Sequence, residues 1–304
     1  MKKSIYRSSD SNVMKFVFEG DGIAVESVLY RYGSFRKRTV ICCSTQCGCP
    51  VGCTFCGTGR MFVRNLTSAE IVEQVHNVLD EIDCPTADNE KFQIMFMSMG
   101  EPFLNYESVA SAIESLNGEY PNAQLLVSTS APGRFMSLSD DFIRLSQKIG
   151  KIGLQVSVHE STDEARAKLI PSGTLPLLDI ASIGEAWAAA TGRHPFYNYC
   201  VHDGNDTEED ADRLVDIFRP WIWETTLSVI CEKDESVKAS ISRQLSLIED
   251  FRKKLEARGA SCRVFNPAGQ DDIGGGCGQL WYFQKWRNEL AMKASGGTGC
   301  EVAK

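Results

Sequence analysis

The sequence contains no apolar run long enough to cross a membrane, and no apolar segment near its amino terminus that could serve as a signal peptide. Residues Met1 to Ser4 lead directly into polar residues. These absences predict a cytoplasmic protein without a membrane association. In that reducing compartment, the twelve cysteines are expected to bind metal or to carry out chemistry, and not to form structural disulfides.

Basic residues are fewer than acidic residues. The 304 residues include 32 Lys and Arg against 40 Asp and Glu, which gives a net charge of −8. Proteins that bind nucleic acid through many phosphates usually have a basic face, so this balance counts against a broad RNA-binding surface. A local basic groove is still possible, because several basic residues fall near the cysteine-rich segment in the sequence: Arg31, Arg36, Lys37, Arg38, Arg60 and Arg64.

Three cysteines are concentrated in one short segment. Cys49, Cys53 and Cys56 have the spacing C-x3-C-x2-C and follow the apolar run 39–43, which predicts a buried strand. Glycine and proline interrupt the segment, which indicates a loop wrapped around a ligand. Crowded thiolates repel one another unless a cation or cluster neutralises them, and thiolates are the usual ligands of iron–sulfur clusters. Three ligands on a cluster of four irons would leave one iron open to a substrate or cofactor.

Two other interpretations use the same cysteines. A structural zinc site usually takes four ligands, often as two C-x2-C pairs. Cys43 or Cys47 could supply a fourth ligand, but the sequence has no second C-x2-C pair. A disulfide knot would require secretion. A non-catalytic zinc-binding module is therefore the alternative to an iron–sulfur site.

Apolar strand patterns alternate with amphipathic helix patterns along most of the chain. This alternation predicts an α/β fold with a parallel sheet and right-handed crossovers, namely a partial (β/α)6 barrel over residues 37–295. A small antiparallel hairpin is expected within residues 1–36, with residues 1–12 frayed, and residues 296–304 are expected to form a flexible tail. The predicted barrel strands are 39–43, 92–97, 123–127, 152–156, 196–201, 225–230 and 261–265.

Polar residues follow several of these strands. In barrels of this type, functional groups gather on the loops after the carboxyl ends of the strands. Here those loops carry the three cysteines, Gly100-Glu101, Ser128, and Ser157 with His159. Taken singly, a glutamate could accept backbone hydrogen bonds, a serine could cap a helix, and a histidine could be half-buried and satisfied. Together they predict one functional rim.

Two segments resemble a known family. The string Cys-Gly-Cys-Pro-Val-Gly-Cys-Thr-Phe-Cys-Gly-Thr-Gly at 47–59, followed by Arg64-Asn65-Leu66-Thr67, resembles the radical S-adenosylmethionine (SAM) enzymes, in particular the RlmN/Cfr-type adenine methyltransferases. The segment 270–280 resembles that family's Asp-Asp-Ile…Cys-Gly-Gln-Leu. The two motifs are specific as a pair, and the likeness extends over roughly residues 14–292.

The resemblance implies a set of cofactor ligands. A [4Fe–4S] cluster would be held by Cys49, Cys53 and Cys56. Gly100 and Glu101 would hold the amino group of SAM, because a carboxylate beside an ammonium makes a charge-assisted bond. The family segments that touch the carboxylate and ribose of SAM match Ser128, Ser157, Val158 and His159. Relatives have an Asn-Pro stretch where this chain has residues 229–233, and no SAM contact is expected there.

The resemblance also implies a mechanism, methylation of carbon 2 or carbon 8 of adenine. Such a carbon is too electron-poor to attack the methyl group of SAM, so a radical is needed. Cys277 would take a methyl group from one SAM, and a radical made from a second SAM would activate that methyl group for addition to the ring. Glu26 would remove the ring proton. Cys42 would then attack the sulfur of Cys277 and release the product with formation of a disulfide. Cys43 should point to the opposite face of the strand.

The methyl acceptor is less defined. The family default is RNA, either ribosomal or transfer RNA, with a reductant such as flavodoxin as the electron donor. Relatives that methylate ribosomal RNA carry an additional amino-terminal RNA-binding domain, whereas this chain begins almost at the hairpin. The basic residues usual before Asp-Asp-Ile are replaced by Gly269 and Gln270. A smaller adenine-containing or heteroaromatic acceptor is therefore the alternative. We expect a monomer.

Overall fold

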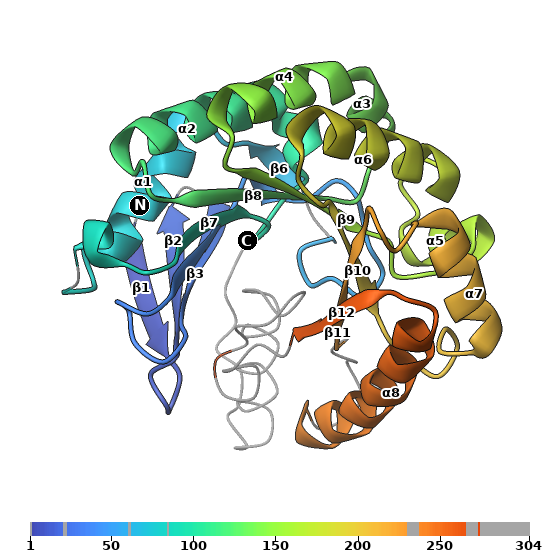
Figure 1. Cartoon of the computed structure of the whole chain (residues 1–304). Helices are drawn as coiled ribbons and strands as arrows, with labels where there is room; N and C mark the ends of the chain where they lie inside the picture. The colour runs from blue at the N-terminus through green and yellow to red at the C-terminus, as the bar shows by residue number, and fades with distance from the viewer. Residues whose placement is uncertain are drawn as a thin grey trace, which may run out of the picture.

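The computed structural model describes residues 2–20, 23–59, 62–83, 85–229, 237–265 and 273. One ten-stranded sheet curves into an open barrel, with helices outside it (Figure 1). The strand order is β1-β2-β3-β4-β7-β8-β9-β10-β11-β12. A second sheet of two short strands, β5 (Gln46–Gly48) and β6 (Phe62–Asn65), was not predicted. Strands of three or four residues are too short to show a period in the sequence.

The parallel part of the large sheet confirms the predicted partial barrel. Each neighbouring pair from β4 to β12 in the order above is parallel. Six strand–helix units are followed by one last strand. The strands are β4 (Thr39–Cys43), β7 (Phe92–Phe96), β8 (Gln124–Thr129), β9 (Ile152–Ser157), β10 (Phe196–Cys200), β11 (Glu224–Ser228) and β12 (Ser261–Phe265).

Helices cover the convex face of the sheet (Figure 1). They are α1 (Ser68–Leu79), α2 (Tyr106–Glu119), α3 (Gly133–Ser137), α4 (Ser139–Ile149), α5 (Asp163–Leu169), α6 (Leu177–Thr191), α7 (Glu208–Ile217) and α8 (Val237–Ala257), with 3-10 turns η1 (Thr86–Asp88) and η2 (Pro102–Asn105). Thr67 and Glu70 form a capping box at the start of α1, where the side chain of each accepts from the other's backbone N–H. None of the described helices is both long and apolar enough to span a membrane.

The amino-terminal segment extends the same sheet. The strands β1 (Lys2–Arg7), β2 (Val13–Gly20) and β3 (Ile23–Arg31) are antiparallel, and β3 pairs antiparallel with β4. The prediction that residues 1–12 are frayed is wrong for Lys2–Arg7. An edge strand needs few apolar residues, because one of its faces is in water, and a salt bridge of 2.8 Å from Lys3 Nζ to Glu81 Oε1 fastens it to the residues after α1.

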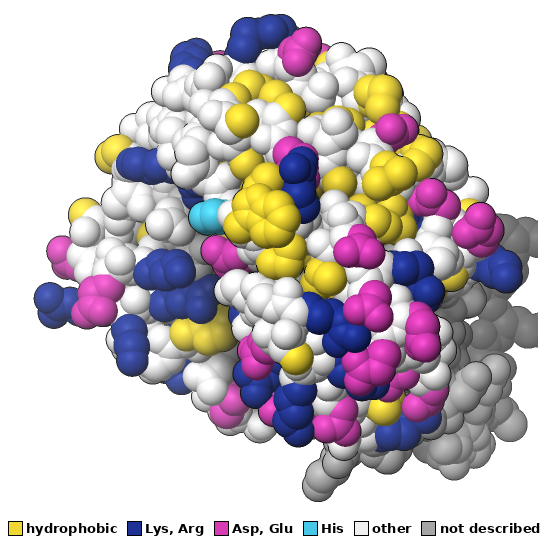
Figure 2. All heavy atoms as spheres, turned by 45° about the vertical axis from the view of Figure 1, so that its right-hand side comes forward, with side chains coloured by type: hydrophobic (Ala, Val, Ile, Leu, Met, Phe, Trp, Pro, Cys, Tyr) yellow, Lys and Arg dark blue, Asp and Glu magenta, His cyan; other side chains and the backbone are white. Residues whose placement is uncertain are grey.

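Side chains alternate across each barrel strand, and this alternation creates the site. On β7, Ile94 and Phe96 face the helices and belong to the main hydrophobic core. Gln93 and Met95 point the other way, and they line a cavity of about 510 Å³ on the concave side of the sheet. On the face of the molecule that Figure 2 shows, acidic and basic side chains are intermingled, so no broad basic surface forms there.

Candidate active site

The cysteine loop lies at the carboxyl end of the parallel strands. Cys49, Cys53 and Cys56 lie between β5 and β6, they are all half-buried, and they all line the cavity. Gly48 and Gly52 both have positive φ, 79° and 74°, which lets the chain turn back around the three thiols.

The cysteine loop is fastened to the opposite side of the rim. The backbone N–H of Thr54 donates to the carbonyl oxygen of Leu169 at 3.0 Å, which ties the loop to the end of α5. The ring of Phe55 packs edge-to-face on the ring of His159, with 5.2 Å between the centroids. The loop is therefore held from the far side of the cavity, although its residues follow β4.

The chemistry of these thiols fits an iron–sulfur cluster. Burial, with a smaller contribution from neighbouring negative groups, raises the pKa of Cys49 to about 12 and raises the pKa of Cys53 as well. The neighbouring groups are the other cysteines of the loop and Glu101. Metal coordination removes such a cost, because the bound metal stabilises the thiolate. Within the described ranges, no three His, Cys, Asp or Glu side chains are grouped closely enough to hold a single metal ion.

The neighbouring cysteines point elsewhere. Cys43 belongs to the main core, and its Sγ donates to the carbonyl oxygen of Met95 at 3.6 Å. Cys47 is buried, with its Sγ 3.4 Å from the carbonyl oxygen of Ala24. Neither is therefore turned toward the cavity as a fourth ligand. No disulfide bond joins two of the described cysteines. Cys277 lies outside the described residues.

Glu101 is a buried carboxylate that already holds several hydrogen bonds. It accepts from Thr129 Oγ1 at 2.6 Å, from the N–H and the hydroxyl of Ser130 at 2.7 Å each, and from the N–H of Phe103 at 3.1 Å. Burial raises the pKa of Glu101, and the bonds from Thr129 and Ser130 act in the opposite direction. These fixed donors orient a carboxylate on the cavity wall, where it can bind an ammonium group.

Gly100 sets the approach of Glu101. Its φ is 96°, and a Cβ at this position would lie 2.7 Å from the backbone nitrogen of Gln46. Gln46 Oε1 in turn accepts from the N–H of Glu101 at 2.8 Å. Only glycine fits this backbone without displacing β5 or Glu101.

The next two strands contribute polar groups to the same wall. Ser128 on β8 and Ser157 on β9 line the cavity, as expected for inward-facing residues near the carboxyl ends of parallel strands. Val158 is fully buried in the main core, and its backbone N–H donates to the carbonyl oxygen of Asn198 at 3.0 Å. The sequence did not single out Thr129 and Ser130, which hold Glu101. The tripeptide Ser128-Thr129-Ser130 was the available signal, but which hydroxyl faces which partner depends on the fold.

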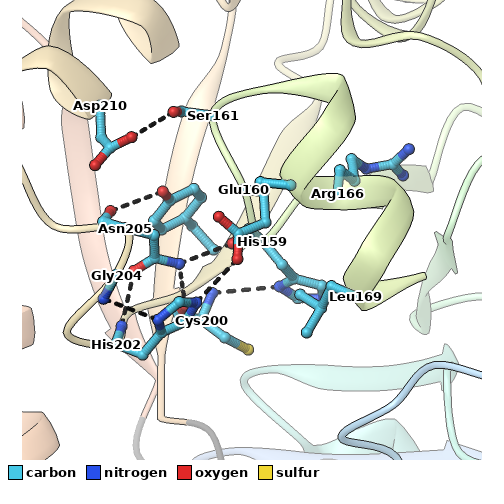
Figure 3. Close-up of polar contacts among 12 residues, drawn as sticks. His159, Glu160, Ser161, Arg166, Leu169, Cys200, His202, Gly204, Asn205 and Asp210 are labelled. Carbon is cyan, nitrogen blue, oxygen red and sulfur yellow. Dashed lines mark hydrogen bonds and ion pairs between the residues drawn. The ribbon is translucent and has the colours of Figure 1, made fainter. Parts of the chain in front are cut away.

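His159 belongs to a polar network shown in Figure 3. Its backbone has a φ of 64°, which is uncommon outside glycine. Its Nδ1 accepts from the N–H of Cys200 at 3.2 Å. Burial, with smaller contributions from Arg166 and His202, lowers the pKa of His159 to about 3. The imidazole is therefore neutral with its hydrogen on Nε2, and it lines the cavity as a hydrogen-bond donor.

Asn205 holds the backbone around His159 (Figure 3). Its Nδ2 donates to the carbonyl oxygens of His159 and Cys200, at 2.9 Å each. Its Oδ1 accepts from the N–H of His202 at 2.8 Å, and its carbonyl oxygen accepts from the hydroxyl of Tyr199 at 2.8 Å. This fully buried amide fixes the strained turn that presents the histidine. Nothing in the sequence distinguishes it from an asparagine in a surface turn.

Arg166 links the carboxyl ends of β8 and β9 by hydrogen bonds. It is almost fully buried in α5, and its guanidinium donates to the carbonyl oxygens of Ser130 at 2.7 Å, Ser157 at 3.0 Å and Val158 at 3.2 Å. These bonds satisfy carbonyl groups that the sheet leaves unpaired. In the sequence Arg166 looks like an ordinary charged residue on an exposed helix face.

Glu26 and Cys42 lie on one face of the antiparallel strands. Cys42 pairs with Val28 across β3 and β4, and both line the cavity. Glu26 lies two residues before Val28, so it is on the same face of β3. Its side chain is fully buried, and burial raises the pKa of Glu26 while the nearby charge of Lys15 opposes the shift. A raised pKa suits a group that takes a proton near neutral pH.

The described basic residues near the cysteine loop in sequence do not form one groove beside it, and Arg60 lies outside the described residues. Arg64 pairs with Glu70 at 2.7 Å. Arg38 precedes β4, at the amino end of the parallel strands, and its guanidinium carbon lies 4.4 Å from the centroid of the Tyr32 ring. Neighbours in sequence are separated here by the length of a strand.

Several known proteins have sequences similar to this chain. The Radical SAM superfamily model matches residues 43–181. A probable dual-specificity RNA methyltransferase RlmN from Heliobacterium modesticaldum is 33% identical over 266 residues, which is 86% of this chain and 68% of that protein. A ribosomal RNA large subunit methyltransferase N from Nitrosopumilus maritimus is 30% identical over 91% of this chain and 80% of its own length.

Solved structures show the same likeness. The crystal structure of a radical SAM methyltransferase from Sphaerobacter thermophilus has a TM-score of 0.72 and 30% identity, and the match covers 92% of this chain and 81% of that one. Streptococcus suis SuiB bound to S-adenosylmethionine has a TM-score of 0.52 over 77% of this chain and 51% of its own. Its identity is 13%, so it shows a likeness of fold alone.

Proposed function

The chain belongs to the radical SAM superfamily and is related to the RlmN methyltransferases, and from this premise we propose that it methylates an sp2 carbon, carbon 2 or carbon 8, of an adenine base. Its cofactors are a [4Fe–4S] cluster and SAM. The observation that carries the proposal is a single cavity lined by Cys49, Cys53, Cys56, Glu101 and Cys42. The expected cofactor ligands and the thiol of Cys42 thereby line one cavity.

The residues of the rim would hold the two cofactors. Cys49, Cys53 and Cys56 would ligate three irons of the cluster, which when bound supplies the electron for reductive cleavage of SAM. Glu101 would accept hydrogen bonds from the amino group of SAM. Ser128, Ser157 and the Nε2–H of His159 would bind its polar groups lower on the wall. Val158 lies in the same turn, with its N–H bonded to Asn198 and its carbonyl oxygen to Arg166.

Residues on the opposite wall would react with the acceptor. Glu26 would take the proton that leaves the ring carbon. Cys277, methylated beforehand, would carry the new carbon to the ring. The thiolate of Cys42 would then attack the sulfur of Cys277, forming an S–S bond and breaking the bond between that sulfur and the transferred carbon. The carbon keeps the bonding electrons and takes a proton, which completes the methyl group, and a reductant must reopen the disulfide before the next turnover.

One described residue of the carboxy-terminal motif supports the proposed reaction between Cys42 and Cys277. Ile273 is buried in a small hydrophobic cluster that also contains Val28 and Cys42. Cys277 follows Ile273 by four residues, and four residues of extended chain reach at most roughly 14 Å. The chain is therefore long enough to bring the sulfur of Cys277 to the wall that carries Cys42.

The names of the relatives favour RNA as the carrier of the adenine, because the similar proteins are described as RNA methyltransferases. A small adenine nucleotide is a second candidate. The cations at the far end of the cavity, at the amino ends of the strands, would suit the phosphate of either acceptor.

The substitution Gly100→Ala should weaken SAM binding by about tenfold or more. A Cβ would force the backbone of Gln46 or Glu101 to move, and a non-glycine residue at positive φ costs about 1–2 kcal/mol in addition. Equilibrium binding of SAM to the reconstituted protein measures the effect. Gly118→Ala on α2 is the matched control, because nothing lies within 4 Å of a Cβ there. Equal SAM affinity in both variants would show that Gly100 does not position the SAM-binding carboxylate.

The direct test of the proposed function is the mass of the peptide that contains Cys277. Protein purified from cells that supply SAM should carry one additional methyl group on this cysteine. Alkylation and peptide sequencing by tandem mass spectrometry would assign the methyl group to its sulfur. An unmodified thiol in protein that has a full cluster and cleaves SAM would refute the methyl-transfer mechanism.

A further inference from the structure

Cationic side chains line the end of the cavity opposite the cysteine loop. Arg38, Lys91, Lys151 and Arg193 each lie in the segment just before a parallel strand. The strands all run from this end toward the cysteine loop, so these four residues meet at the amino-terminal mouth of the barrel. Arg263 joins them from β12. We call these five residues the cationic mouth.

Arg263 points inward and is held by neutral groups. Its Nε donates to Thr226 Oγ1 at 2.8 Å, and its guanidinium carbon lies 4.0 Å from the centroid of the Phe196 ring. Thr226 and Phe196 also line the cavity. A hydroxyl and an aromatic face orient the guanidinium without cancelling its charge, and several of its N–H donors stay available.

Arg38, Arg193 and Lys151 are held in the same way. Arg38 Nε donates to Gln93 Oε1 at 3.0 Å. Arg193 Nη1 donates to the carbonyl oxygen of Gly150 at 2.9 Å, and Lys151 Nζ to a backbone carbonyl oxygen. All of these partners are neutral. The neighbours fix where the positive charges lie, and the charges themselves are not compensated by them.

No ion pair within the described ranges includes a member of the cationic mouth. Burial lowers the pKa of Lys91, and the positive charges of Arg38 and Arg263 lower it further. Burial lowers the pKa of Arg263, and the negative charge of Glu224 opposes that shift. In a chain with a net charge of −8, five cations around one opening form a strong local anion-binding field.

A glycine lies beside the cationic mouth. Gly153 is on β9 at a cavity-lining position. A Cβ there would lie 2.9 Å from Leu126 Cδ1 and 3.9 Å from Arg193 Nη2. The guanidinium of Arg193 therefore lies beside a glycine on the inner wall, where a larger residue would crowd it.

The middle of the cavity is uncharged. Between the cationic mouth and the rim, the wall consists of Tyr30, Val40, Met95, Leu126, Gln155 and Asn198. Apolar and amide groups of this kind suit a heteroaromatic base. Arg38 and Cys42 are four residues apart along one extended segment, or roughly 13 Å. One end of a nucleotide can thus lie at the cations while its base lies near the thiol.

We propose that the cationic mouth binds a phosphate of the acceptor nucleotide, so that the acceptor spans the cavity with its base toward Cys42 and its phosphate between Lys91, Arg193 and Arg263. The inference rests on the proposed adenine acceptor. The phosphate can belong to a free mononucleotide or to an RNA strand, and both offer the same oxygen atoms to arginine and lysine donors.

Equilibrium binding to the holoprotein tests this inference with three probes, which are AMP, adenosine and the dinucleotide ApA. AMP or ApA should bind at least about tenfold more tightly than adenosine, and added salt should reduce the advantage. The variants Arg263→Gln and Lys91→Gln should each reduce it by about tenfold, because each removes a charged hydrogen-bond donor to phosphate. Lys148→Gln is the matched control, since Lys148 pairs with Glu114 between the outer helices α4 and α2.

The outcomes distinguish a free mononucleotide from an RNA strand, and they distinguish the phosphate-binding inference from the proposed methyltransferase function. Tighter binding of AMP indicates a mononucleotide, and tighter binding of ApA indicates an RNA strand; either supports the cationic mouth if Arg263→Gln and Lys91→Gln weaken it. Equal affinity for adenosine and both phosphates, or binding that neither substitution changes, overturns the inference. Methylation of Cys277 needs no acceptor, so its mass in the same variants reports separately on the proposed function and on their folding.

Discussion

Protein with Cys53→Ala should contain little or no iron after anaerobic reconstitution, and should cleave no SAM. Cys53 is one of three thiols that line the rim of the cavity, and two thiolates cannot hold a cluster of four irons in place. The brown absorbance of the cluster and the formation of 5′-deoxyadenosine should both disappear. Cys49→Ala and Cys56→Ala should behave in the same way.

Cys262→Ala is the matched control for the cluster. Cys262 lies on β12 and packs against the main core, on the other side of the strand from the cavity-lining Arg263. Its removal should leave iron content and SAM cleavage close to those of the unaltered protein. Cleavage of SAM that persists at a normal rate in Cys53→Ala would contradict the assignment of the three ligands.

Protein with Cys42→Ala should accumulate a covalent adduct between its own chain and the acceptor. In the proposed sequence, addition to the ring joins Cys277 to the adenine carbon, and the thiol of Cys42 is the group that breaks this link. Without it the reaction should stop after one event per protein molecule. Mass spectrometry of the intact protein, followed by nuclease or peptide digestion, should detect the adduct on Cys277.

Cys43→Ala separates the chemical role of Cys42 from its role in packing. The two cysteines are neighbours on β4, but Cys43 is in the main core, where burial raises its pKa to about 12. Its replacement is expected to cost about 1–3 kcal/mol of stability and to trap no adduct. Free methylated product at normal yield from Cys42→Ala would show that another group resolves the link.

Local features of the site were the easiest to predict from sequence. The three cluster cysteines lie within eight residues, so their spacing and the glycines between them already define a loop around a ligand. The capping box of Thr67 and Glu70 that the structure shows is likewise a local feature, complete within four residues. The order of strands and helices followed from their alternating periods, and it predicted the curved parallel sheet.

Other features were predicted wrongly from the sequence, or could not be predicted from it, because they depend on contacts between distant segments. Lys2–Arg7 is a strand because it pairs with β2 and because Lys3 meets Glu81, not because its own residues favour a strand. Glu101 is held by Thr129 and Ser130 across 28 and 29 residues, and Asn205 holds His159 across 46. Such partners have no signature in the local pattern.

The sequence by itself determined the family, the cofactor loop and the alternation that builds the barrel, because each is written in residues that are close together along the chain. The tertiary structure alone decided which end of the cavity is charged. Arg38 is eleven residues before Cys49 in the sequence, yet it lies with Lys91 and Arg263 at the opposite end of the barrel. Parallel strands bring their amino ends to one edge and their carboxyl ends to the other, and a strand's length separates what the sequence places together.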